Sequence, residues 1–159
     1  MNYGGMTTDQ VPNAQRARWI SSLSQADPAG LEAYWTLLPS PPAYRWLRPA
    51  ESGLVMLQGR AGGNGQGFNL GEMTATRAVA VLDGDRPLTG FGYVAGRNKR
   101  HAELAALFDA LLQDETRRPV LLRELIEPIE ADHQARRDSR ASAVAATRVD
   151  FTTMVRGDA

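Results

Sequence analysis

The sequence contains no cysteine among its 159 residues. This absence excludes disulfide bridges, a cysteine nucleophile, and iron–sulfur or cysteine-ligated zinc sites made by this chain. Only two histidines are present, so we expect no metal site built by this chain alone. Lysine is almost absent as well, because 17 of the 18 basic residues are arginine and the remaining one is Lys99.

The sequence also lacks a net charge and a long apolar run. Its 18 basic residues balance 18 acidic ones, which argues against a strongly basic nucleic-acid binder or a polybasic membrane binder. No segment approaches the roughly 18 consecutive apolar residues of a membrane-spanning helix. Residues 1–15 show neither the basic nor the apolar region of a signal peptide. We therefore expect a cytoplasmic protein with no membrane or nucleic-acid partner.

The composition that remains is that of an ordinary packed globule. Hydrophobic residues make up 43% of the chain and charged residues 23%, which favours one folded domain of this length. We expect a flexible leader over residues 1–12. A single domain then covers residues 13–159 and ends in a helix and a strand-like tail.

Two helices are predicted near the start of the chain. Asn13 is expected to cap a helix that runs to about Ser24. Asp27 followed by Pro28 is a typical helix start, and the second helix is expected to reach about Leu38. The proline-rich residues 39–42 then end it.

The middle of the chain predicts an antiparallel sheet of about four strands. The candidate strands, rich in Val, Thr and aromatic residues, are residues 44–47, 53–61, 72–83 and 88–95. Short turns join them, including a glycine-rich segment at residues 62–67. Parallel pairing needs longer crossover connections, so these turns favour a meander. The glycine-rich segment is not a P-loop, because no lysine follows it at the required spacing.

The last part of the chain returns to helical patterns. One helix is predicted from about Asn98 to Gln113, and a second from Val120 to Ile126. Pro128 is expected to interrupt the second helix, which resumes from Ile129 to about Thr147. The predicted fold class is α+β: N-terminal helices, an antiparallel sheet, then C-terminal helices.

The strongest local signal for binding is a cluster of cations where the last strand turns into a helix. Arg97, Lys99, Arg100 and His101 fall within five positions. Cations at a helix N-terminus oppose the helix dipole, and a bound anion would reverse that cost. A phosphate or a carboxylate of a partner is therefore a candidate ligand. In the alternative interpretation, Glu103 pairs with Lys99 and Arg100, and His101 is part of the apolar helix face.

Ordered motifs give the chain a family resemblance from about residue 14 onward. They are Ala50–Val55, Gly59–Gly65, Thr76–Val79, Gly92–Val94 with Gly96 and Arg97, His101–Glu103, Asp109–Leu111 and, most specifically, Thr147–Phe151 with Thr153–Asp158. With these motifs the chain resembles the PhnG family, the G subunits of the bacterial carbon–phosphorus lyase core complex.

The resemblance implies a role within a complex. Members act with the H, I and J core subunits and the accessory L subunit in phosphonate catabolism. The step linked to G replaces the adenine of MgATP by methylphosphonate, giving alpha-D-ribose 1-methylphosphonate 5-triphosphate and adenine. The nucleosidase chemistry is attributed to the I subunit. An iron–sulfur cluster and S-adenosylmethionine serve the J subunit, so no cofactor is expected in this chain.

Nothing in the resemblance gives this chain a catalytic residue, and no G-x-S-x-G or H-E-x-x-H motif occurs in it. We expect a subunit of a transferase complex that is inactive by itself. The polar late helix and the tail are expected to pack on partners through Arg148, Val149, Phe151, Met154 and Arg156. The alternative function is a stand-alone phosphate- or nucleotide-binding module that uses residues 97–101.

Overall fold

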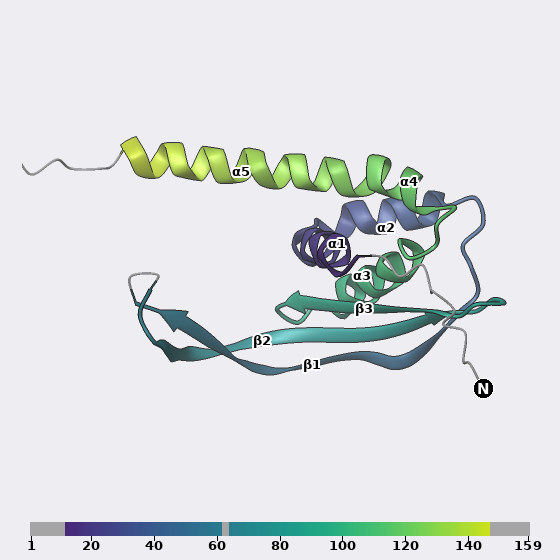
Figure 1. The fold of residues 1–159 in the computed structure, drawn as a ribbon, viewed down its shortest axis with the longest axis horizontal. Helices are drawn as coiled ribbons and strands as arrows, with labels where there is room; N and C mark the ends of the chain where they lie inside the picture. The colour runs from purple at the N-terminus through teal and green to yellow at the C-terminus, as the bar shows by residue number, and fades with distance from the viewer. Residues whose placement is uncertain (1–11, 62–63, 147–159) are drawn as a thin grey trace, which may run out of the picture.

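The computed structural model describes residues 12–61 and 64–146. Three strands, β1 (Tyr44–Arg60), β2 (Gly67–Leu82) and β3 (Leu88–Ala95), pair antiparallel in the order β1-β2-β3. Helices α1 (Asn13–Gln25), α2 (Pro28–Leu37) and α3 (Lys99–Leu111) form a layer on one face of this sheet (Figure 1). Above them run α4 (Arg118–Leu121), the π-helical segment Leu122–Ile126 and α5 (Glu127–Ala146). The α+β prediction is confirmed, with three strands rather than four.

The missing fourth strand has a local explanation. The segments predicted at residues 44–47 and 53–61 belong to one long strand, β1. Pro49, which has no N–H to donate, lies between the two predicted segments. The pairing of β1 with β2 shifts register between Trp46 and Arg48 and again between Arg48 and Glu51. These irregularities accommodate the proline without ending the strand.

In the core, the backbone of α3 packs very closely against the backbone of β3. A Cβ atom added to Gly90 would lie 1.9 Å from the carbonyl oxygen of Ala106, and one added to Gly92 would lie 1.9 Å from that of Ala102. Only glycine fits at these two positions. The other face of the same strand carries Phe91, which is half-exposed. One face of the sheet is therefore packed on helices, and the described helices leave the other uncovered (Figure 1).

The helix starts test two of the capping predictions. The Asp27 carboxylate accepts the N–H of Gly30 at 3.1 Å, which confirms Asp27 as the cap of α2. The prediction for Asn13 is wrong, because Pro12 occupies the capping position and no side chain caps α1. Asn13 is the first residue inside that helix.

Pro128 does not interrupt the late helix, which corrects the prediction of a break there. The turn before it, Leu122–Ile126, widens into a π-helix, and the N–H of Glu127 donates to the carbonyl of Leu122 five residues back. A proline in a helix removes one hydrogen bond and crowds the carbonyl four residues earlier. The wider turn takes up this misfit. As a result α4, the π-segment and α5 follow one line (Figure 1).

Two parts of the molecule extend together beyond the middle helical layer. Ala75 of β2 is opposite Ala95, where β3 ends, so residues 54–60 and 67–74 form a two-stranded ribbon. We call these residues the arm. The later part of α5 extends on the same side of the molecule, above the arm and beyond α1 and α3 (Figure 1). No helix in the described ranges is long and apolar enough to cross a membrane.

Candidate functional site

The turn between β3 and α3 holds the cations that the sequence singles out. Gly96 has a φ of +89°, a backbone conformation that favours glycine. Its N–H donates to the carbonyl of Thr74 at 2.8 Å, and its carbonyl accepts the Thr76 hydroxyl at 2.6 Å. Asn98 then caps α3 by accepting the N–H of His101 at 3.0 Å. The turn is therefore fixed to β2 on one side and to the helix on the other.

Two of the four predicted anion-binding residues have partners inside the chain. The guanidinium of Arg100 donates two hydrogen bonds to Glu32 of α2, at 2.6 and 2.9 Å, and approaches Glu103 at 3.4 Å. These bonds hold the pKa of Glu32 below its usual range and raise that of Arg100. His101 is buried, and its Nε2 lies 2.8 Å from the carbonyl oxygen of Leu23. Because a carbonyl only accepts, Nε2 carries the proton in this contact.

The other two, Arg97 and Lys99, are exposed. Neither has an ion pair within residues 12–61 and 64–146. The turn therefore offers two cations to a ligand, while Arg100 and His101 connect α3 to α2 and α1. Anion binding at residues 97–101 stays a prediction.

The predicted partner-contact residues fall outside the described ranges. Arg148, Val149, Phe151, Met154 and Arg156 all lie within residues 147–159, so their role stays a prediction. The helix before them is described and is nearly all surface: apart from His133, residues 131–145 are exposed. The late helix therefore buries little against the other described residues, and its contact with partners stays a prediction.

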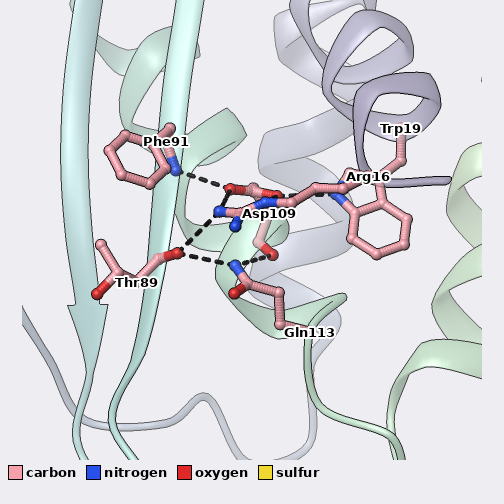
Figure 2. Close-up of polar contacts among 6 residues, drawn as sticks. All are labelled: Arg16, Trp19, Thr89, Phe91, Asp109 and Gln113. Carbon is pink, nitrogen blue, oxygen red and sulfur yellow. Dashed lines mark hydrogen bonds and ion pairs between the residues drawn. The ribbon is translucent and has the colours of Figure 1, made fainter. Parts of the chain in front are cut away.

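A buried carboxylate, to which the sequence analysis gave no role beyond its place in a family motif, organises the core. Asp109 of α3 is 0% exposed, and Figure 2 shows its carboxylate between α1 and β3. One oxygen, Oδ1, accepts Arg16 Nε at 3.1 Å and Trp19 Nε1 at 2.8 Å. The other, Oδ2, accepts Arg16 Nη2 at 2.8 Å and the N–H of Phe91 at 2.9 Å. Both oxygens are thus fully engaged by donors.

The same group of residues covers the outer edge of β3. Arg16 Nη2 and Gln113 Nε2 donate to the carbonyl of Thr89 at 3.0 and 2.8 Å (Figure 2). Side chains therefore pair backbone groups that an edge strand would otherwise leave open. The role of Asp109 is structural, since it has no free position for a substrate proton. The signal in the sequence was an acidic residue inside the apolar run 104–112.

A cavity of about 550 Å³ lies where α2 ends near α4. Its lining is mainly apolar, with Tyr34, Arg117 and Glu124 among the few polar side chains. The Tyr34 hydroxyl lies 3.4 Å from Glu124, and burial raises the pKa of Tyr34. Within the described ranges, no group of three or more His, Cys, Asp or Glu is placed to hold a metal ion.

Comparison with known proteins decides the family. The family model for phosphonate metabolism protein PhnG matches residues 14–157, which is nearly the whole chain. The chain belongs to the PhnG family. A relative within it, the alpha-D-ribose 1-methylphosphonate 5-triphosphate synthase subunit PhnG of Rhizobium meliloti (strain 1021), is 40% identical over 152 residues. The match covers 96% of each chain. The PhnG resemblance inferred from the ordered motifs is confirmed.

Proposed function

We propose that this chain is a non-catalytic subunit of a carbon–phosphorus lyase core complex. In that complex it supports the transfer of the ribose triphosphate of MgATP to methylphosphonate, with release of adenine. The observation that carries the proposal is the 40% identity, over nearly the full length of both chains, to a protein named as a subunit of the corresponding synthase. The partners would be the H, I and J core subunits and the accessory L subunit.

The described side chains support a role without chemistry of its own. The one fully buried carboxylate, Asp109, is engaged by Arg16, Trp19 and Phe91. The buried histidine, His101, is bonded to a backbone carbonyl. Neither group is available as a general acid or base. Bond breaking in the complex is therefore assigned to other subunits, with MgATP as a substrate and the iron–sulfur cluster and S-adenosylmethionine on the J subunit.

Reconstitution tests this function directly. The purified chain is mixed with the H, I and L subunits, MgATP and methylphosphonate, and adenine release is followed by chromatography. We expect adenine only when this chain and its partners are all present, and none from the chain by itself. Adenine release by the isolated chain, or an undiminished rate without it, would contradict the proposal.

The tail is tested by truncation. Deleting residues 149–159 should abolish co-purification with the I subunit, because the alternating apolar residues of the tail are proposed to pack on that partner. The circular dichroism of the isolated chain should stay unchanged. Equal recovery of the I subunit with and without these residues would rule out the tail as its contact.

The exposed pair Arg97 and Lys99 keeps a phosphate-binding function open as a second candidate. Triphosphate added at millimolar concentration should raise the melting temperature of the isolated chain if the turn binds it, since a ligand of the folded state stabilises that state. Replacing both residues by alanine should remove the shift. Arg86→Ala is the matched control, because Arg86 is also exposed and lacks a partner among the described residues. No shift with the unaltered chain would exclude this site.

A further inference from the structure

The arm is a part of the sheet that the described residues leave two-stranded. Among them only β1 and β2 pair there, because β3 ends opposite Ala75. A two-stranded ribbon without a packed face is marginally stable in water. This region therefore gains the most from a second layer packed against it.

No helix within residues 12–61 and 64–146 covers the face of the arm that continues the core. The register places Leu54 opposite Thr74 and Met56 opposite Glu72, on the same face as Ala78, which α3 covers. Leu54 is 65% exposed and Met56 is 50% exposed. The helical layer stops where α3 begins, at the root of the arm (Figure 1). The apolar face thus extends farther than the helices that cover it.

Three cations lie at the two ends of the arm. Arg60 lies at the end of β1 in the arm. Arg97 and Lys99 follow Gly96, which is bonded to Thr74 at the arm's root. None of the three has an ion pair among the described residues. The arm contains a single acidic residue, Glu72.

Two more cations lie on the later part of α5, on the side of the helix that faces α1. His133 Nε2 lies 2.8 Å from the carbonyl of Gln25, so this side of α5 faces α1. Arg137 and Arg140 follow at four and seven residues, which places them on the same side of the helix. Both are exposed and have no ion pair within the described ranges. Figure 1 shows that this part of α5 lies above the arm, separated from it by the level of α1 and α3.

We propose that the inner face of the arm, with Leu54 and Met56, is the docking surface for an amphipathic helix of another subunit that carries acidic residues. The proposal rests on the function proposed above. The helix would continue the middle layer, at the spacing of roughly 8–10 Å that packed helices keep from their neighbours. Its apolar side contacts Leu54 and Met56, and its carboxylates pair with the cations from the arm, from α3 and from α5.

Charge favours an acidic helix of another subunit over two other possible occupants of this surface, the tail of the same chain and a second copy of the chain. Residues 147–159 of the same chain contain two arginines and two aspartates, so the tail brings no excess of negative charge. A second copy of the chain would bring the same cations to the interface, and like charges repel. An acidic helix from a different subunit is the occupant that neutralises the surface.

The test is co-expression of the full chain with the H, I and J subunits. The double variant Leu54→Lys/Met56→Lys should lower partner recovery at least about tenfold, because it places charge where apolar side chains must meet. The charge-reversal variant Arg137→Glu/Arg140→Glu should lower it too, with a loss that is smaller at high salt. Leu47→Lys is the matched control for the first, since Leu47 lies on the same strand outside the arm and is 62% exposed. Arg86→Glu is the control for the second.

Each outcome decides between the proposals. If the unaltered chain recovers no partner, the proposed function fails. If it recovers partners and the arm variants recover them equally, the function stands and the docking surface is overturned. A dimer of the isolated chain that Leu54→Lys dissociates would assign the surface to a second copy. Faster amide exchange in the arm after deletion of residues 147–159 from the isolated chain would assign it to the tail. A photocrosslink from position 54 to an acidic helix of a partner would support the proposal.

Discussion

The body of the molecule is packed differently from its overhang, by which we mean the arm together with the part of α5 that extends above it. In the body, where α1, α2 and α3 lie on the sheet, Trp19 and Phe108 are fully buried. No buried side-chain nitrogen or oxygen among the described residues lacks a hydrogen bond. In the overhang, Leu54 and Met56 are exposed, and Arg137 and Arg140 have no ion pair among those residues. The described residues of the body bury their apolar side chains and satisfy their buried polar groups, whereas those of the overhang leave apolar side chains and cations exposed.

The largest expected effect on the difference between body and overhang comes from removing the buried carboxylate of Asp109. Asp109→Ala should lower the free energy of unfolding by about 3–5 kcal/mol, because it leaves Arg16, the Trp19 indole and the Phe91 N–H without their acceptor. Urea unfolding of the isolated chain measures the loss. Asp138→Ala is the control in the overhang, where Asp138 accepts only the exposed amide of Gln134, and it should change stability by less than about 0.5 kcal/mol. Equal losses for the two variants would erase the distinction between body and overhang.

The close contact between α3 and β3 gives a smaller expected effect. Gly92→Ala should cost about 1–3 kcal/mol or more, because its Cβ would meet the carbonyl oxygen of Ala102 and push the helix off the strand. Gly53→Ala, next to the arm, has no atom within 4 Å of the added Cβ. That variant should leave stability unchanged or raise it by up to about 1 kcal/mol. Urea unfolding compares the two, and a harmless Gly92→Ala would show that α3 can move away freely.

The sequence predicted the body better than the features that depend on distant contacts. The helix after Asp27 and the apolar face of α3 could be located because their signals are local: a cap with proline, and a repeat of apolar residues. Pro128 suggested a break that a π-helical turn absorbs, and the two strands predicted on either side of Pro49 are one strand with shifts in register. Such compensation depends on the neighbouring strand or turn and leaves no local pattern.

For the same reason, the sequence could not tell which residues of the predicted basic turn are paired within the fold and which are available to a ligand. Its four residues are adjacent in sequence, but the partners that separate them are not: Glu32 is 68 residues from Arg100, and the carbonyl of Leu23 is 78 residues from His101. The structural role of Asp109 was missed in the same way, since its donors come from α1 and β3. Local spacing identified the charges, and the fold decides which of them remain available to a ligand.

The smallest expected effect lies at the junction of the two regions. Arg18 of α1 donates to Glu130 of α5, and Ser22 donates to the same carboxylate at 3.1 Å. The hydrogen bond from Arg18 lowers the pKa of Glu130 from its ordinary value of 4.5. The carboxyl thus binds its proton less tightly in the folded chain than in the unfolded one. Its stabilisation is complete above the unfolded value and is lost as the pH falls through the lower, folded value.

Glu130→Gln should therefore lower the free energy of unfolding at pH 7 by less than about 1 kcal/mol, as expected for an ion pair that water still reaches. The difference from the unaltered chain should shrink as the pH is lowered past the folded pKa of Glu130. Urea unfolding across this pH range measures both, and Glu115→Gln is the control, because Glu115 is exposed and has no partner among the described residues. A difference that persists undiminished in acid would mean that Glu130 secures α5 to the body by packing rather than by charge. The boundary of the body would then lie farther along α5.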